Sequence, residues 1–159
     1  METKQKYIEQ WERVIRWHER LKETSSLDAQ SIPTDRFQDD IFAFFLNCYH
    51  LKDWIKHDPS AAHMKDQVEA YINSSEALSL CADLCNGLKH RTLDSSRSKQ
   101  DPQFDSKIYR MAYTDNTPGL SLGYLIVTSK HSYDAFSLAG VCLMDWETFL
   151  YANQAPITP

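Results

Sequence analysis

Hydrophobic side chains recur every three or four positions in four long stretches of the chain, and this spacing is typical of helices with one buried face. In the second stretch, apolar residues around Phe37, Ile41 and Phe45 surround the middle on nearly all sides, so we expect this helix at the centre of a bundle. The predicted helices cover about residues 3–24, 34–57, 61–92 and 135–152.

The third predicted helix carries a signal for an interruption. Ser60 is a suitable cap for a helix that begins at Ala61. Further along, Asn73 and Glu76 have the spacing of a capping box, with Asn73 as the cap and Glu76 reaching back to it. We therefore expect this helix to kink or restart near Asn73 before it continues to its end.

Between the last two helices the pattern changes to one typical of strands. Residues 107–115 and 120–129 are rich in β-branched and aromatic side chains, and the Asn116–Gly119 segment between them has the composition of a turn, which predicts a β-hairpin over about 107–129. No long linker or internal repeat interrupts the chain. The prediction is one mainly α domain over 1–159, a bundle of four to five helices with a small antiparallel hairpin before the C-terminal helix.

Composition excludes several classes of protein. Apolar residues make up 42% of the chain, which is too many for a disordered protein, and the longest apolar run, residues 41–46, is too short to span a bilayer. The charged N-terminal residues lack the apolar segment of a signal peptide. We therefore expect a cytoplasmic protein with no membrane partner.

The charge of the chain is acidic overall and locally basic. The net charge of −5 argues against a long duplex-binding surface. Residues 89–99 nevertheless contain four basic side chains, Lys89, Arg91, Arg97 and Lys99, and one acidic side chain, Asp94. This local excess is enough for a phosphate contact. A solvated basic loop explains it equally well.

The four cysteines, Cys48, Cys81, Cys85 and Cys142, lie among apolar neighbours, which is typical of reduced thiols packed in the core of a cytosolic protein. Cys81 and Cys85 are one helical turn apart, so both could bind one metal ion with a histidine from elsewhere. No C-x-x-C or H-E-x-x-H spacing supports that alternative. We predict no metal and no other cofactor.

The segment "CADLCNGLKHRTL" near the end of the third helix has an apolar face and a polar face. At 100° per residue, Asp83, Asn86 and His90 form a stripe almost opposite the core face, with Lys89 at its edge. A histidine can transfer a proton near neutral pH, a lysine can stabilise a phosphorane-like transition state, and an asparagine can orient the imidazole or hold the phosphate. His90, Asn86 and Lys89 are therefore candidate catalytic residues for phosphodiester chemistry. The alternative is an ordinary polar helix end that the helix dipole favours.

Gly87 lies within this polar face. A glycine inside a helix costs about 1 kcal/mol relative to alanine. Its presence indicates either close approach to the backbone or the end of the helix.

A second polar stripe lies on the second predicted helix, where His50, Asp53 and His57 share one face. A buried charge needs a partner. If the second and third helices pack antiparallel, we expect His50 and Asp53 to support His90.

The sequence resembles the HEPN family of helical-bundle domains, which includes many prokaryotic ribonuclease toxins and defence effectors. The hallmark of that family is an arginine, a polar residue, a few further residues and a histidine on a late helix. In "CNGLKH", Asn86 fits the polar position, His90 fits the histidine, and Cys85 stands in the position of the arginine. The segments "FFLNCYHLKDWI", "CADLCNGLKH" and "DWETFL" are also similar to uncharacterised bacterial proteins related to this fold.

The resemblance implies an RNA-directed protein, a metal-independent endoribonuclease in a toxin–antitoxin or defence system whose two motifs meet across a homodimer. His90 would then be the acid or base, Asn86 and Lys89 would position the phosphate, and Arg91 would replace the missing arginine as a phosphate-binding residue. The alternative is a catalytically inactive HEPN-like module that forms a homodimer or binds a partner protein or a nucleotide.

Overall fold

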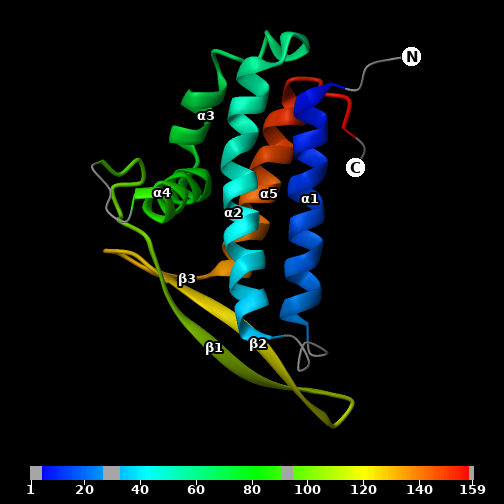
Figure 1. The fold of residues 1–159 in the computed structure, drawn as a ribbon, viewed down its shortest axis with the longest axis vertical. Coiled ribbons are helices and arrows are strands. Elements are labelled where there is room, and N and C mark those ends of the chain that lie inside the picture. The colour runs from blue at the N-terminus through cyan, green and yellow to red at the C-terminus, as the bar shows by residue number, and fades with distance from the viewer. Residues whose placement is uncertain (1–4, 27–32, 91–94, 158–159) are drawn as a thin grey trace.

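The computed structural model describes residues 5–26, 33–90 and 95–157. Within these ranges the chain forms five α-helices, a short 3₁₀ turn and a three-stranded antiparallel sheet in the order β1-β2-β3 (Figure 1). The elements are α1 Lys6–Ser25, α2 Thr34–His57, η2 Pro59–Ala61, α3 Val68–Ser74, α4 Glu76–His90, β1 Gln103–Thr114, β2 Thr117–Val127, β3 Ser132–Asp134 and α5 Ala135–Ala152. The prediction of a mainly helical fold with a small antiparallel sheet before the C-terminal helix is confirmed. In the described residues, no helix combines the length and the apolar character needed to cross a membrane.

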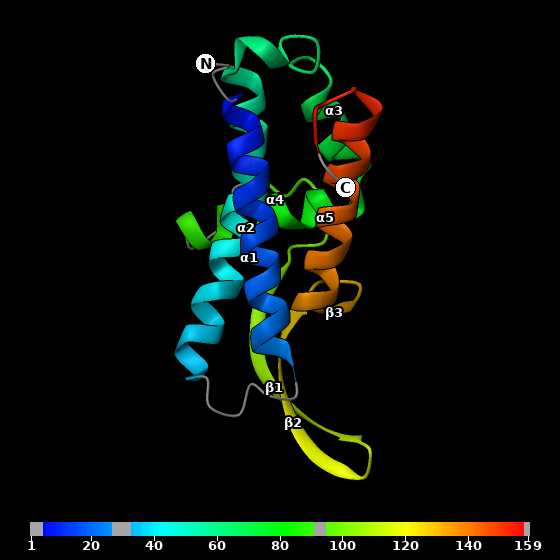
Figure 2. The same ribbon diagram turned by 90° about the vertical axis from the view of Figure 1, so that its right-hand side faces the viewer.

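Three long helices stand side by side, and a fourth crosses them. Helices α1, α2 and α5 run along the long axis of the molecule, whereas α4 is seen almost end-on in Figure 1 and lies crosswise in Figure 2. All residues of α4 from 77 to 85 are buried. The sequence predicts α2 at the centre of the bundle, but α4 is the helix that is covered on all sides over this stretch.

The third predicted helix is divided into three pieces. A 3₁₀ turn and further turns occupy residues 59–67, and the regular helix begins only at Val68. The Asp58 side chain caps the 3₁₀ turn by accepting a hydrogen bond from the Ser60 amide at 2.9 Å, so the expected Ser60 cap is wrong. The expected cap at Asn73 is also wrong, because the Ser75 hydroxyl accepts from the Leu78 amide at 3.0 Å and α4 starts at the next residue.

The hairpin is longer than predicted, and its turn is tighter. Thr114 pairs with Thr117, which leaves only Asp115 and Asn116 in the turn. Their φ angles are 50° and 62°, as a type I′ turn requires, and the residues expected in the turn after Asn116 belong to β2 instead. The short strand β3 pairs with residues 125–127 of β2 and was missed, since three residues carry almost no periodic signal.

Candidate functional site

The polar residues of the candidate motif lie in the last turns of α4. Asn86 is half-buried and Lys89 is exposed, and neither has a hydrogen-bond or ion-pair partner among the side chains that the structure describes. His90 ends the helix, but its side chain lies outside the described part of the chain, as does the whole of Arg91. The structure therefore places two of the four candidate residues, Asn86 and Lys89, at a helix end, while the contacts of His90 and Arg91 lie outside the described part of the chain.

The core face predicted for α4, made of Leu78, Cys81, Leu84, Cys85 and Leu88, is confirmed for the first four residues, whereas Leu88 is exposed. Cys85 is 3% exposed, and its thiol donates to the Phe45 carbonyl at 3.1 Å, while the Cys81 thiol donates to the same oxygen at 3.4 Å. The position that the family resemblance gives to arginine therefore points into the core, where a guanidinium would need a buried partner.

Asp83, by contrast, does not belong to an exposed polar stripe. It is fully buried, because residues 96–98 fold back over α4 and surround its carboxylate with donors. Oδ1 accepts from the Arg97 amide at 2.8 Å, and Oδ2 accepts from the Ser98 amide at 2.9 Å. The hydroxyls of Ser96 and Ser98 donate to Oδ2 at 2.7 and 2.6 Å. A helical wheel does not predict this cover, since it comes from a loop that follows the helix.

The Arg97 side chain is half-buried and held in an ion pair, although the sequence suggested it for a phosphate contact. Its guanidinium donates to Glu69 on α3 at 2.8 Å, and Lys52 and Lys56 of α2 reach the other oxygen of the same carboxylate at 3.3 and 2.9 Å. Burial alone would raise the pKa of Glu69, but the hydrogen bonds from Lys56 and Arg97 and the charge of Lys52 lower it to about 2. This cluster, which sequence reasoning missed, ties the loop to α2 and α3.

The expected supporting residues lie on the surface of α2. His50 is exposed, and the Asp53 carboxylate lies 3.4 Å from the Lys52 ammonium. Neither contacts Asn86 or Lys89 within the part of the chain that the structure describes. The sequence predicts that His50 and Asp53 support His90 if α2 and α4 pack antiparallel. In the structure α4 crosses α2 instead (Figures 1 and 2). The buried carboxylate of α2 is Asp40, which pairs with Arg20 at 3.0 Å.

A cleft of about 570 Å³ opens beside the same end of α4, along a different face. Leu84, Gly87 and Leu88 form its α4 wall, roughly opposite Asn86 and Lys89 on the helix. A β-carbon placed on Gly87 would meet no atom within 4 Å. Gly87 thus leaves open space on the cleft side of the helix, and its expected place within the polar face is wrong. The remaining lining residues are Gln38, Phe42, Asp101, Pro102, Gln103, Phe104 and Tyr124.

The cleft combines aromatic rings with amide groups. The ring centroids of Phe42 and Phe104 are 4.7 Å apart, and Tyr124 lies 5.8 Å from Phe104. Gln38 and Gln103 offer amide donors and acceptors at its edge, and Asp101 offers a carboxylate. Among the described residues, no histidine, lysine, arginine or cysteine lines it. Such a lining suits the binding of a planar, polar molecule.

The thiols do not form the cluster that the sequence suggested. Cys81 and Cys85 share a carbonyl acceptor, yet the grouping of potential metal ligands in the described residues is Cys48, Cys81 and Cys142. Burial raises the pKa of the Cys81 and Cys142 thiols well above the ordinary value.

No family model, curated protein or solved structure matches this chain. The resemblance to HEPN proteins therefore stays a prediction from the sequence.

Proposed function

We propose that this chain is a HEPN-like binding module that takes up a nucleotide, free or as an unpaired base of RNA, without cleaving it. The observation that carries the proposal is the face on which the cleft opens. The cleft lies against Leu84, Gly87 and Leu88, and the polar motif residues Asn86 and Lys89 are directed away from it.

The chemistry of the cleft supports a nucleobase as its ligand. Unpaired bases stack on aromatic side chains, and amide groups form hydrogen bonds with their edges. Phe42, Phe104 and Tyr124 supply the rings, while Gln38 and Gln103 supply the amides. Because the chain is acidic overall, reading single bases suits it better than binding a long polyanion along its backbone.

The position of Cys85 supports binding without cleavage. A buried thiol stands where the resembled motif has its phosphate-contacting arginine, and Arg97 is paired with Glu69. The motif arginine, which could stabilise a pentavalent phosphate, is therefore absent. The charge of Arg97 is already neutralised by Glu69.

The test is an equilibrium titration that measures the affinity of the protein for a labelled single-stranded RNA and for each of the four nucleoside monophosphates. We expect Gly87→Leu to fill the cleft and weaken binding at least roughly tenfold, since a leucine side chain excludes a stacked base. Met144→Leu, on the exposed surface of α5 and outside the cleft, is the control and should bind like the native protein. Equal affinities for both variants would contradict the proposal.

A second candidate function is metal-independent RNA cleavage with His90 as the acid or base. The observation in its favour is that Asn86 and Lys89 have no partner among the described side chains. Incubation of the native protein and His90→Ala with the same RNA separates the two functions. RNA fragments formed by the native protein and lost with His90→Ala would support the nuclease.

A further inference from the structure

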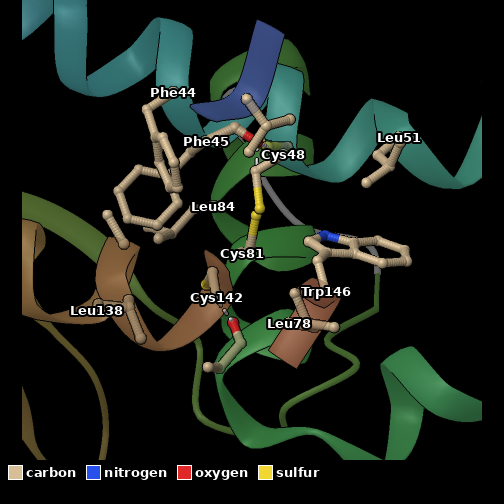
Figure 3. Close-up of a cluster of buried hydrophobic side chains, with 14 of the residues drawn as sticks. Phe44, Phe45, Cys48, Leu51, Leu78, Cys81, Leu84, Leu138, Cys142 and Trp146 are labelled. Carbon is tan, nitrogen blue, oxygen red and sulfur yellow. Dashed lines mark hydrogen bonds between the residues drawn. The ribbon is translucent and has the colours of Figure 1, made fainter. Parts of the chain in front are cut away.

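Three cysteines that are far apart in the sequence meet in the centre of the core. Cys48 comes from α2, Cys81 from α4 and Cys142 from α5, and their three sulfur atoms all lie within 4.8 Å of one another (Figure 3). Each is at most 1% exposed and free of any disulfide. Cys85 is also buried, but it lies outside this group.

The indole of Trp146 gives an independent indication of a ligand at this position. Its Nε1 group is buried, makes no hydrogen bond of normal geometry with the described residues, and is directed at the Cys48 thiol. Figure 3 shows the ring beside the sulfurs, with the nitrogen on the side that faces Cys48 and Cys81. A buried N–H without a partner is costly, and a metal-bound sulfur is a stronger acceptor than a neutral thiol.

We propose that Cys48, Cys81 and Cys142 bind one monovalent copper ion through their three sulfurs. Thiolate sulfur selects soft ions such as copper(I) and zinc. A metal about 2.3 Å from each sulfur, the distance typical of metal–thiolate bonds, places the sulfurs about 4 Å apart. The group thus needs to contract by less than about 1 Å.

The number of ligands favours copper(I) over zinc. Structural zinc sites have four protein ligands, and catalytic zinc replaces one of them with water. Here the described residues offer three sulfurs, and the surrounding core admits no solvent. A three-coordinate soft monovalent ion matches this set of three sulfur ligands.

Binding exchanges thiol protons for the metal. The Cys81 and Cys142 thiols donate long hydrogen bonds of 3.4 Å to the carbonyls of Phe45 and Ala77. Their sulfurs turn from these oxygens to the ion, Cys48 binds as the third thiolate, and the three displaced thiol protons pass to solvent without any change of oxidation state. The ion would cross-link α2, α4 and α5 at the centre of the bundle.

The test is a titration of reduced, metal-free protein with copper(I) under anaerobic conditions, in competition with a chromophoric copper(I) chelator. The native protein should remove one equivalent from the chelator. Cys48→Ala should bind roughly 100-fold more weakly, and Cys85→Ala, which removes a thiol equally deep in the core, should bind like the native protein. Cys142→Ala provides a second test if Cys48→Ala fails to fold.

X-ray absorption of the copper-loaded protein should show three sulfur neighbours. The proposal is overturned if the native protein takes no copper from the chelator, if Cys85→Ala weakens binding as much as Cys48→Ala, or if zinc binds more tightly than copper(I).

Discussion

The buried carboxylate of Asp83 allows a sharp prediction, because its two oxygens receive two different backbone amides. Oδ1 accepts from the Arg97 amide and Oδ2 from the Ser98 amide, and the Ser96 and Ser98 hydroxyls also donate to Oδ2. In Asp83→Asn, either orientation of the amide turns an NH₂ group toward one of these N–H donors. The hydroxyls can rotate and accept, but a backbone N–H cannot.

The expected loss follows from that geometry. One backbone N–H is left without an acceptor, which costs about 1–3 kcal/mol, and the surviving bonds lose their charged acceptor, worth about 1 kcal/mol more. We therefore expect Asp83→Asn to lower the free energy of unfolding by about 2–4 kcal/mol. The loss should be accompanied by release of the 96–98 segment from α4, because these bonds hold it there.

Urea denaturation of the native protein and Asp83→Asn measures the change in stability, and amide hydrogen exchange at Arg97 and Ser98 measures the release of the loop. Asp101→Asn makes the same chemical change at an exposed carboxylate near the same loop and should stay within about 0.5 kcal/mol of the native protein. An Asp83→Asn variant as stable as this control, with unchanged exchange, would refute the reasoning.

Three further predictions concern other positions. The pKa of Glu69 is about 2 in the fold against an ordinary 4.5, so its ion pairs stabilise the protein above pH 4.5 and this stabilisation is lost as the pH falls toward 2. Glu69→Gln should therefore lower the free energy of unfolding by about 1–2 kcal/mol at pH 7, as measured by denaturation curves. A stability difference between the variant and the native protein that stays constant down to pH 2 would contradict this. Gly87→Ala should raise stability by about 0.5–1 kcal/mol, because the added methyl meets open space; a destabilised variant would show that the helix or cleft is tighter than described. Asn116→Gly should raise the melting temperature and Asn116→Val should lower it, since φ is 62° at this turn position; melting curves that do not separate the two variants would refute the type I′ assignment.

The long elements could be predicted from the sequence because their signals are local. Helix α5 was predicted at 135–152 and α2 at 34–57, and both bounds are confirmed, since amphipathic spacing and the proline after Asp58 act within the chain segment itself. The division of the third helix was less accurate. Several residues around it can serve as caps, and only the tertiary structure decides that Asp58 and Ser75 do so.

The candidate site could be predicted only in part, for a similar reason. The wheel placed Cys81 and Cys85 on the core face, and their burial confirms this. It also placed Asp83 on a polar face, and there it failed because the covering loop comes from another part of the chain. The cleft beside Gly87 and the group of three thiols are both formed by elements that are remote in sequence, so no local sequence pattern predicts them.

The most direct test of nucleotide binding in the cleft is a two-dimensional NMR titration of the isotopically labelled protein with nucleoside monophosphates. The account predicts that the Gly87 backbone amide and the side-chain amides of Gln38 and Gln103 shift on titration, and that the backbone amides of the exposed α5 residues Val141 and Met144 do not. Saturable shifts centred on any other surface, or no saturable shift at the cleft residues with any of the four nucleotides, would contradict the account.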